Sequence, residues 1–377
     1  MPLSWIYGGA VSLRNFCFDV GLLKSRAFHV PVISVGNITV GGTGKTPHVE
    51  YLVRLLQKSF HVAVLSRGYK RKTSGYLLAD SNTTARDIGD EPMQMKTKFP
   101  DISVAVDRKR VHGIQQLTAD DRQLDVILLD DAFQHRYVKP GVNILLVDYH
   151  RLIIYDKLLP AGRLREPLKG KNRADIVIVT KCPRELKPME FRVITKAMSL
   201  YPYQHLYFTT IDYDQPRAVF GNRKLQLDSL SNTSVLLLTG IASPRQLEED
   251  IQHLIPGHSA TITLTFPDHH DFRRKDISRI NETFAQMHSP KVIITTEKDA
   301  TRLVNAEGLS DEVRQSIYAL PVRISFMQQE QADKFDQFIV GYVHKNSRNS
   351  ILAKGKEDIA PKENKHNTTK KNTISFQ

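Results

Sequence analysis

The sequence is poor in cysteine and has no long hydrophobic run. Its 377 residues include two cysteines, Cys17 and Cys182, which are too few for a disulfide framework or a four-cysteine metal site and favour a reducing compartment. No run of about 18 apolar residues occurs, so we expect no transmembrane helix. The sequence also lacks a zinc-site pattern and an RRM-like aromatic motif. A nucleic-acid enzyme is therefore the weakest interpretation, and we expect no nucleic-acid partner.

Positive charge is present in excess. The 53 Lys/Arg outnumber the 40 Asp/Glu, which gives a formal net charge of +13. Residues 345–377 hold eight Lys/Arg and three Asp/Glu, so this tail carries +5 (8 − 3) of the total. The balance favours an anionic partner, such as a nucleotide, a nucleic acid or an acidic membrane surface. The Lys- and Asn-rich composition predicts a disordered basic tail at 344–377, either a dispensable extension or a membrane contact.

An apolar periodicity marks residues 1–28. Apolar side chains recur at spacings of three and four, which predicts an amphipathic helix, at Ile6, Ala10, Leu13, Cys17 and Val20. No basic region precedes this segment and no clear cleavage site follows it, so we do not expect a signal peptide. Two interpretations stay open: an interfacial membrane helix, or a helix packed on its own domain.

The central part of the chain alternates short apolar runs with helix-like segments. This alternation predicts a P-loop NTPase-like α/β domain at 29–215, with a parallel sheet flanked by helices, from runs at 30–36, 61–66, 102–106, 124–131, 142–148 and 174–180. The polar, turn-rich segment 212–224 predicts the connection to a second domain. A second, smaller α/β domain is expected at 216–343, from runs at 234–240, 260–266, 291–296 and 320–326.

The segment GNITVGGTGKTP at 36–47 predicts a phosphate-binding loop. The standard pattern G-x-x-x-x-G-K-[ST] would place a glycine where Thr39 stands, so a strict match is absent. The physical features remain: an apolar strand, a glycine-rich turn, and an amphipathic helix that starts at Lys45 or Thr46. Backbone N–H groups in such a turn bind phosphate oxygens. We therefore expect nucleotide contacts from Gly41, Gly42, Thr43, Gly44, Lys45 and Thr46.

A second cation anchor is expected at the end of the run LDVILLDD. Asp130 and Asp131 follow four apolar residues, at the strand end where parallel sheets bind ligands. Together with Thr46 they could hold Mg²⁺, although a solvated strand end is the plain alternative. The segment Thr180–Pro183 has no aspartate where guanine-specific proteins carry one, which favours ATP over GTP.

Three functions compete at this point: a small-molecule or lipid kinase, an NTP-driven switch or partner-loading ATPase, and the weaker nucleic-acid enzyme. A kinase needs groups that position and deprotonate an acceptor hydroxyl. Polar clusters at 89–92, 131–136 and 266–272 could supply them. Each also has a plain alternative, as a helix cap, a strand end or a polar helix N-terminus.

Eight motifs in a fixed order resemble one known family. Over roughly residues 1–343 the chain resembles tetraacyldisaccharide 4′-kinase, the lipid A 4′-kinase family of Gram-negative bacteria. The displaced glycines are part of the resemblance. The motifs are VGNITVGGTGKTP, SRGYKR, GDEP, LDDAFQHR, LPAGRLREP, TGIASP, FPDHHDF and TTEKDA.

The resemblance implies a reaction and a location. The reaction would be ATP- and Mg²⁺-dependent transfer of the γ-phosphate to the 4′-hydroxyl of a tetraacyl disaccharide 1-phosphate, giving the 1,4′-bisphosphate of lipid A biosynthesis. The location would be the cytoplasmic face of the inner membrane. The N-terminal helix would then act as a peripheral membrane anchor, with Lys24 and Arg26 near anionic headgroups.

The resemblance also implies site roles. Asp90 would be the catalytic base and His269 its helper, with His270 left open as an alternative. Further residues lie in matching segments as substrate-binding or supporting groups, namely Glu91, Arg110, Gln134, His135, Arg165 and Glu166. Two positions depart from the family pattern: Ala132 replaces a common glycine, and Arg163 replaces proline or tryptophan. A methyl at position 132 would be strained if φ were positive.

Overall fold

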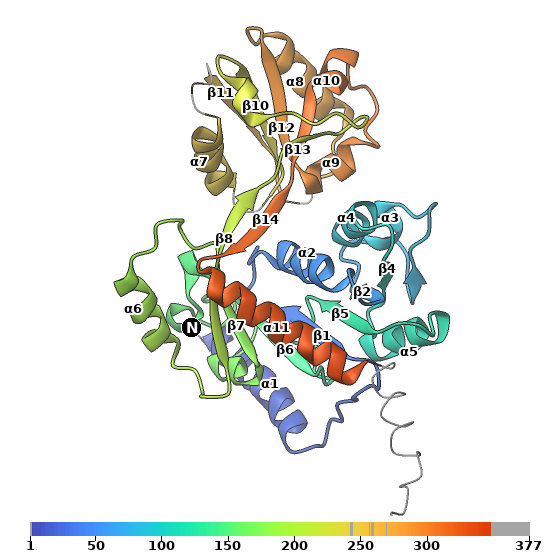
Figure 1. Cartoon of the computed structure of the whole chain (residues 1–377), viewed down its shortest axis with the longest axis vertical. Coiled ribbons are helices and arrows are strands. Elements are labelled where there is room, and N and C mark those ends of the chain that lie inside the picture. Colours follow the sequence, from blue (N-terminus) through green and yellow to red (C-terminus); the bar gives the residue numbers. More distant parts are fainter. Residues whose placement is uncertain (1, 242–243, 256, 258–259, 269, 348–377) are drawn as a thin grey trace, which may run out of the picture.

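Two separate β-sheets organise the computed structural model, which describes residues 2–241, 244–255, 257, 260–268 and 270–347 (Figure 1). The larger sheet has nine strands in the order β14-β8-β7-β6-β1-β5-β2-β4-β3, and the smaller has five in the order β11-β10-β12-β13-β9. Neighbouring strands pair in parallel except at the edge strands β14, β3 and β9, which pair antiparallel. The predicted α/β class is confirmed.

The predicted apolar runs form the strands of the larger sheet. Its strands are β1 (Val32–Gly36), β2 (Val62–Ser66), β3 (Leu77–Leu78), β4 (Ser103–Val106), β5 (Val126–Asp130), β6 (Val142–Asp148), β7 (Ile176–Thr180), β8 (His205–Tyr213) and β14 (Val322–Phe326). Its helices are α2 (Lys45–Leu56), α3 (Ala85–Ile88), α4 (Asp90–Lys98), α5 (Arg110–Asp120), α6 (Pro188–Met198) and α11 (Gln329–Asn346). Short 3-10 helices lie at Tyr149–Arg151, Ile153–Tyr155, Leu168–Arg173 and Leu227–Leu230.

Helices cover both faces of this sheet because successive strand residues point to opposite sides. Ile33 and Val35 share one buried cluster with Leu52 of α2, whereas Val32 shares another with Ile114 of α5. The first cluster also contains residues of α4 and α11, and Figure 1 shows these helices on the same face as α2. Each fully buried aliphatic side chain contributes about 1.5–3 kcal/mol relative to exposure.

The smaller sheet has the same layered design. Its strands are β9 (Arg217–Ala218), β10 (Ser234–Thr239), β11 (Ala260–Thr265), β12 (Lys291–Thr296) and β13 (Ile317–Leu320). Its helices are α7 (Pro244–Leu254), α8 (Arg274–Ala285), α9 (Glu297–Leu303) and α10 (Asp311–Ser316). Leu236 packs towards α8, and its neighbour Leu237 packs towards α7, so this sheet too is buried on both faces.

Two crossing strands join the sheets, and one of them corrects a prediction. Residues 320–326 were expected within the smaller domain, but β14 pairs antiparallel with the second half of β8, in the larger sheet. Helix α11 then packs on the larger sheet through Phe335 and Ile339. The apolar run alone could not show this, because a strand's sheet is decided by distant partners. The chain therefore crosses to the smaller sheet after Tyr213 and returns before Val322 (Figure 1).

The two ends of the chain also differ from the expected bounds. Helix α1 spans Pro2–Asp19, shorter than the predicted 1–28, and the following segment is fixed to the larger domain by a bridge between Arg26 and Val138. Helix α11 continues to Asn346, past the expected start of the tail. Residues 348–377 of the predicted tail lie outside the described residues. Among the helices of the described ranges, none has the length and apolar character needed to span a bilayer.

Candidate active site

The glycine-rich loop follows β1 and ends at the first residue of α2, as predicted. Gly41 and Gly44 have φ values of 122° and 78°, a left-handed backbone that favours glycine. Gly36 is needed for space, because a Cβ there would lie 2.8 Å from the backbone N of Phe133. The loop thus presents backbone N–H groups at the start of α2, where an anion is favoured.

Side chains from neighbouring strands hold the loop in this shape. The Asn37 side chain donates to Thr43 Oγ1 at 2.9 Å, and the Thr180 hydroxyl donates to the Thr43 carbonyl at 3.0 Å. Lys181 donates to the Gly42 carbonyl and pairs with a carboxylate of β6. Sequence reasoning used the Thr180–Lys181 pair only as a guanine signature, and it missed their role as supports of the loop.

His48 is a further support that sequence reasoning missed. Its Nδ1 lies 2.7 Å from the Gly44 carbonyl and its Nε2 lies 3.0 Å from Thr209 Oγ1 on β8. Burial lowers the pKa of His48 to about 4, partly offset by the Gly44 contact, so the ring is neutral at pH 7. The loop is thereby connected to the strand that leads to the second sheet.

The two aspartates at the end of β5 lie beside this loop. Asp131 Oδ1 is 3.6 Å from Lys45 Nζ and 3.5 Å from Arg165 Nη1. Burial and the adjacent Asp131 raise the pKa of Asp130 to about 6, while Lys45 opposes this shift. Asp131, not Ala132, carries the positive φ of this turn (48°), so the methyl of Ala132 is tolerated. Three of the predicted site residues therefore meet at one point.

This acidic pair fits Mg²⁺. The Oδ1 atom of Asp130 is buried and lacks a hydrogen-bond partner among the described residues. Mg²⁺ prefers oxygen ligands and usually binds through one or two carboxylates together with phosphate oxygens. The described residues contain no cluster of three or more His, Cys, Asp or Glu that could hold a metal ion alone. A cation here could be completed by the Thr46 hydroxyl and nucleotide phosphates.

Arg110 and His135 lie under and beside the acidic pair. Arg110 donates to the Asp130 carbonyl at 3.1 Å, and burial lowers its pKa to about 10, opposed by the two aspartates. Burial and then the charges of Arg110, Arg14 and Arg67 lower the pKa of His135 to about 4. The three arginines make this part of the site attractive to anionic groups, and the neutral ring of His135 lies among them.

Gln134 and Glu166 support the loop from the other side. Arg173 Nη2 donates to both carboxylate oxygens of Glu166 at 2.9 and 2.8 Å, so this buried charge is paired. Gln134 donates to the Asn37 carbonyl at the start of the loop. The backbone beside Glu166 also bonds to this loop, since the Arg165 N–H donates to the Ile38 carbonyl at 2.8 Å. Glu166 is thus a supporting group.

Asp90 and Glu91 open helix α4 at the same edge of the sheet. Gly89, with φ of 94°, packs tightly against the segment after β2, since a Cβ there would lie 2.9 Å from the Tyr69 carbonyl oxygen. Glu91 is close enough to contribute to the raised pKa of Asp130. Asp90 pairs with Arg302 of α9, and Glu91 Oε1 lies 2.7 Å from Lys298 Nζ.

The histidines of FPDHHDF complete the predicted set. His269 lies outside the described residues. His270 Nε2 lies 2.9 Å from Asp276 Oδ2, so its ring is turned towards the first turn of α8, the helix that follows it. The larger sheet brings together a glycine-rich loop at a helix N-terminus, an acidic pair and the carboxylate of Asp90, which are the kinds of group that phosphoryl transfer uses.

Comparison with known proteins supports the same chemistry. A sequence model of tetraacyldisaccharide-1-P 4′-kinase matches residues 1–340. The tetraacyldisaccharide 4′-kinase of Bacteroides thetaiotaomicron is 53% identical over 363 residues, which cover 93% of this chain and 94% of the relative. The corresponding kinase of Phocaeicola vulgatus is 56% identical over 354 residues, with 93% and 96% covered.

A solved structure agrees with the fold. The structure of LpxK from Aquifex aeolicus in complex with ATP superposes with a TM-score of 0.69 at 30% identity and covers 90% of this chain and 97% of that chain. The family match at residues 1–340 extends over both sheets. The chain belongs to the tetraacyldisaccharide-1-P 4′-kinase family.

Proposed function

We propose that this chain transfers the γ-phosphate of ATP to the 4′-hydroxyl of a tetraacyl disaccharide 1-phosphate, giving the 1,4′-bisphosphate. The observation that supports this most strongly is the meeting of Lys45 and Asp131 at the glycine-rich loop, on the sheet edge that also carries Asp90. This edge can bind a triphosphate and place a carboxylate near its end. It is the arrangement that a phosphotransferase needs.

The loop and the acidic pair would bind the nucleotide. The backbone of residues 41–46 would surround the phosphates, Lys45 would reach the β- and γ-phosphates, and Thr46, Asp130 and Asp131 would hold Mg²⁺. When bound, Mg²⁺ would supply charge neutralisation of the transferring phosphoryl group. Arg165, which already pairs with Asp131, adds a second cation beside the phosphates.

Asp90 is proposed as the group that accepts the proton of the acceptor hydroxyl. An aspartate with an ordinary pKa near 4 is a weak base at pH 7, so it must be well positioned to be effective. Asp90 sits at the start of α4, with its carboxylate fixed by Arg302. His269 is proposed as its helper from the second sheet. Glu91, Arg110, Gln134 and His135 are proposed to shape the substrate side of the site.

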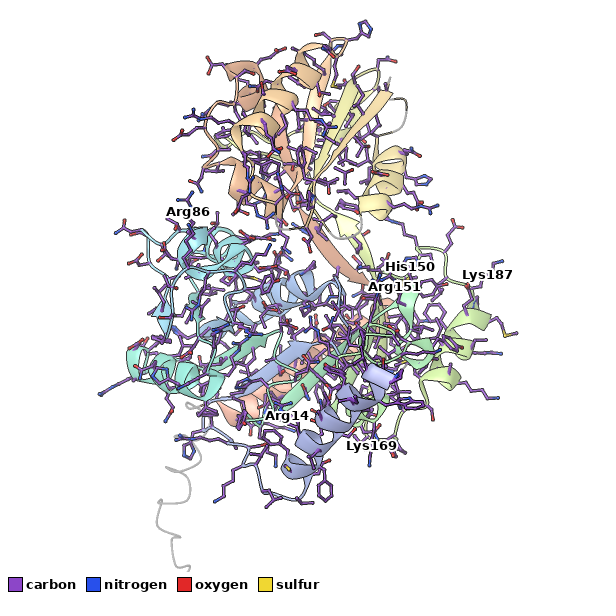
Figure 2. The ribbon with its side chains drawn as sticks, turned by 180° about the vertical axis from the view of Figure 1, so that it is seen from behind. Arg14, Arg86, His150, Arg151, Lys169 and Lys187 are labelled. Atoms are coloured by element: carbon purple, nitrogen blue, oxygen red, sulfur yellow. The ribbon has the colours of Figure 1, made fainter. Side chains whose placement is uncertain are left out.

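Helix α1 is proposed as a peripheral contact with the cytoplasmic face of the inner membrane. One face is fixed to the larger domain: Tyr7 donates to the Arg165 carbonyl at 2.7 Å, and Arg14 donates to the Gln134 carbonyl at 3.1 Å. Figure 2 shows Arg14 on this helix. The opposite face exposes large apolar side chains, namely Leu3, Trp5, Ile6, Leu13 and Phe16, and Val20 and Leu22 follow.

This apolar surface supports membrane binding more than internal packing. A helix that packed only on its own domain would bury its large apolar side chains. Trp5 is instead 77% exposed and Leu22 is 74% exposed, as expected for a helix that binds a membrane surface. The polar contacts of Tyr7 and Arg14 connect the same helix to the loop segments of the active site. An acylated substrate held in the bilayer surface would thus approach the site beside α1.

The role of Asp90 can be tested with Asp90→Asn. The substitution keeps the shape and removes the charge, so we expect kcat to fall by about 100-fold or more. The dissociation constant for ATP should change little, because Asp90 is not part of the phosphate loop. Equal losses in turnover and in ATP binding would instead assign Asp90 to the nucleotide site.

A further inference from the structure

Three ion pairs join α4 of the larger sheet to α9 of the smaller sheet. In two of them α4 supplies the carboxylate, and in the third it supplies the cation. Asp90 pairs with Arg302, Glu91 pairs with Lys298 at 2.7 Å, and Lys98 Nζ lies 2.7 Å from Glu297 Oε1. We call these three pairs the α4–α9 clasp. Each helix supplies both signs, so the charges match in one relative arrangement of the two helices.

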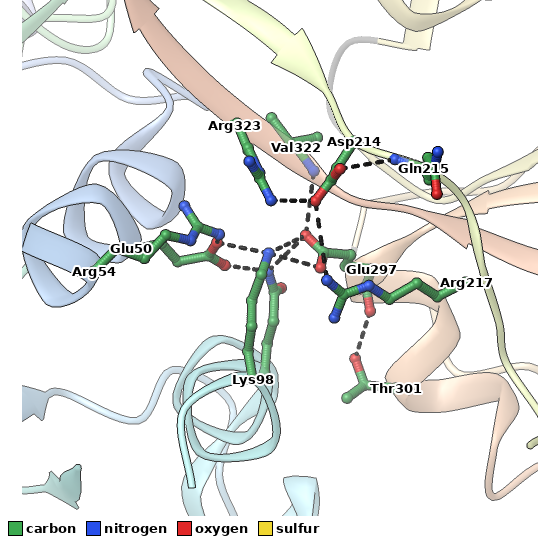
Figure 3. A network of polar contacts seen from close by, with 11 residues as sticks. Glu50, Arg54, Lys98, Asp214, Gln215, Arg217, Glu297, Thr301, Val322 and Arg323 are labelled. Carbon is green, nitrogen blue, oxygen red and sulfur yellow. Dashed lines mark hydrogen bonds and ion pairs between the residues drawn. The ribbon is translucent and has the colours of Figure 1, made fainter. Parts of the chain in front are cut away.

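The clasp is largely removed from solvent and is connected to the nucleotide loop. The side chains of Arg302 and Lys98 are 7% and 10% exposed. Lys98 also lies 2.6 Å from Glu50, a buried residue of α2, the helix that begins at Lys45. Figure 3 shows Lys98 between Glu50 and Glu297. Glu297 further accepts from the Val322 N–H at 3.3 Å, where the chain returns to the larger sheet.

Three motifs of the smaller sheet converge on Arg302. Its Nη1 lies 3.5 Å from Asp299 Oδ1 and 3.5 Å from the carbonyl of His270. Asp299 is fully buried and is fixed by the Gly240 N–H at 2.9 Å and the Thr296 hydroxyl at 2.7 Å. Residues of the motifs TGIASP, FPDHHDF and TTEKDA thus together hold the Arg302 guanidinium, which contacts Asp90 of α4.

Space at Gly240 supports the same conclusion. A Cβ at this position would lie 2.8 Å from Asp299 Oδ1, so a larger residue would displace the group that orients Arg302. Burial acts to lower the pKa of Arg302, but its bond to Asp90 and the nearby carboxylates raise it overall. The guanidinium is therefore a permanent cation in a fixed place.

We propose that Arg302 is a positioning residue for Asp90, carried by the smaller sheet to the carboxylate at the start of α4. Its Nη2 binds Oδ2 of Asp90, which fixes the rotamer of the carboxylate and keeps it charge-paired. Contact between the two sheets therefore contributes to the order of the base. This inference deepens the proposed function and rests on the proposed role of Asp90.

The test compares Arg302→Met, Arg302→Lys and Glu297→Gln in the full-length chain, with kcat and both KM values measured on ATP and tetraacyl disaccharide 1-phosphate. Methionine keeps the length but removes the charge, so we expect kcat to fall about 100-fold. The KM for ATP should stay within about threefold. Lysine restores a cation and should recover about tenfold of the lost kcat.

Glu297→Gln is the matched control, because it weakens another pair of the clasp without contacting Asp90. We expect its kcat to stay within about threefold of the parent, with a lowered melting temperature. Equal losses of kcat in Arg302→Met and Glu297→Gln would overturn the inference, as would a normal kcat in Arg302→Met. The inference would also be contradicted if kcat in Arg302→Lys were as low as in Arg302→Met. Should the methionine variant not fold, Arg302→Gln is judged by the same criteria.

Asp90→Asn separates this inference from the proposed function. In the Asp90→Asn background, Arg302→Met should lower kcat by less than about threefold further, because the two residues act as one unit. Near-normal turnover in Asp90→Asn alone would overturn the proposed base. Slow turnover in Asp90→Asn together with normal turnover in Arg302→Met would overturn only the role of Arg302.

Discussion

The two sheets have the same parallel α/β design but differ in what they place at the carboxyl ends of their strands. The larger sheet places a glycine-rich loop there, with Gly41 and Gly44 in left-handed conformations, beside the acidic pair at the end of β5. The smaller sheet places a buried carboxylate there. Asp299 accepts hydrogen bonds from Gly240, after β10, and from Thr296, at the end of β12. The larger sheet thus presents a backbone loop suited to an anion, and the smaller sheet presents Arg302 to Asp90.

The comparison explains why both sheets belong to one site. A phosphate loop alone binds a nucleotide but does not choose an acceptor, since the same loop serves switches and kinases. The ion pairs between α4 and α9 bring the second sheet to Asp90 at the edge of the first. Backbone variants in the glycine-rich loop should therefore affect nucleotide binding, and variants at Asp90 or behind Arg302 should affect turnover.

Lys45→Ala is expected to have the largest effect. It removes the cation at the loop, whose Nζ lies 3.6 Å from Asp131 Oδ1. We expect transfer to fall by about 1,000-fold or more, because a preorganised charge on the transferring phosphate is lost. Single-turnover transfer from labelled ATP measures this. A near-normal rate would contradict the assignment of the phosphate loop.

A pair of glycine variants sharpens the comparison between the sheets. Gly44→Ala introduces strain at a φ of 78° in the loop, and we expect the KM for ATP to rise about tenfold or more. Gly240→Ala should instead lower kcat about tenfold and leave the KM for ATP unchanged, because it displaces Asp299. Steady-state kinetics on both variants decides this, and the same kinetic defect in both would remove the proposed division of roles.

Substitutions on α1 are expected to change membrane binding without changing the fold. Trp5 and Leu13 are 77% and 64% exposed, so the double variant Trp5→Gln/Leu13→Gln should keep its melting temperature. Its affinity for anionic phospholipid vesicles should fall about tenfold or more, since two apolar contacts with the bilayer are lost. Val304→Gln, at a 50% exposed apolar residue on the other sheet, is the control. Unchanged sedimentation with vesicles would restore internal packing as the role of α1.

A further expected effect concerns the pH dependence of stability. The folded protein keeps His48 neutral down to a pKa of about 4, whereas the unfolded chain protonates it near 6.5. The unfolded state therefore binds more protons between these values, and stability falls as pH falls from 7 to 4, by roughly 3 kcal/mol from this group. His48→Gln should remove this part of the slope in denaturant unfolding curves. An identical slope in the variant would show that His48 does not contribute.

Local patterns predicted much of the larger sheet. Apolar runs of strand length, the glycine-rich turn and the helix beginning at Lys45 were all visible, because each depends on neighbouring residues. The family assignment is also confirmed, because eight separate motifs carried it. The roles of Asp90, Asp130 and the other site residues stay predictions.

Long-range partners were beyond the reach of the same reasoning. The second half of β8 pairs with β14, which is more than one hundred residues later, so the run at 320–326 was assigned to the wrong sheet. His48 was missed because its partner Thr209 lies 161 positions away. Arg302 was missed for the same reason, since its contact with Asp90 joins residues 212 positions apart. A sequence pattern shows which side chains exist but not which distant strand or helix brings them together.

The most direct test of the account is phosphate transfer from γ-labelled ATP to purified tetraacyl disaccharide 1-phosphate in detergent, with Mg²⁺ and with EDTA. We expect labelled lipid with Mg²⁺ and none with EDTA, because Asp130 and Asp131 are proposed to hold the cation. Release of free phosphate without labelled lipid would contradict it and favour an NTP-driven switch or partner-loading ATPase.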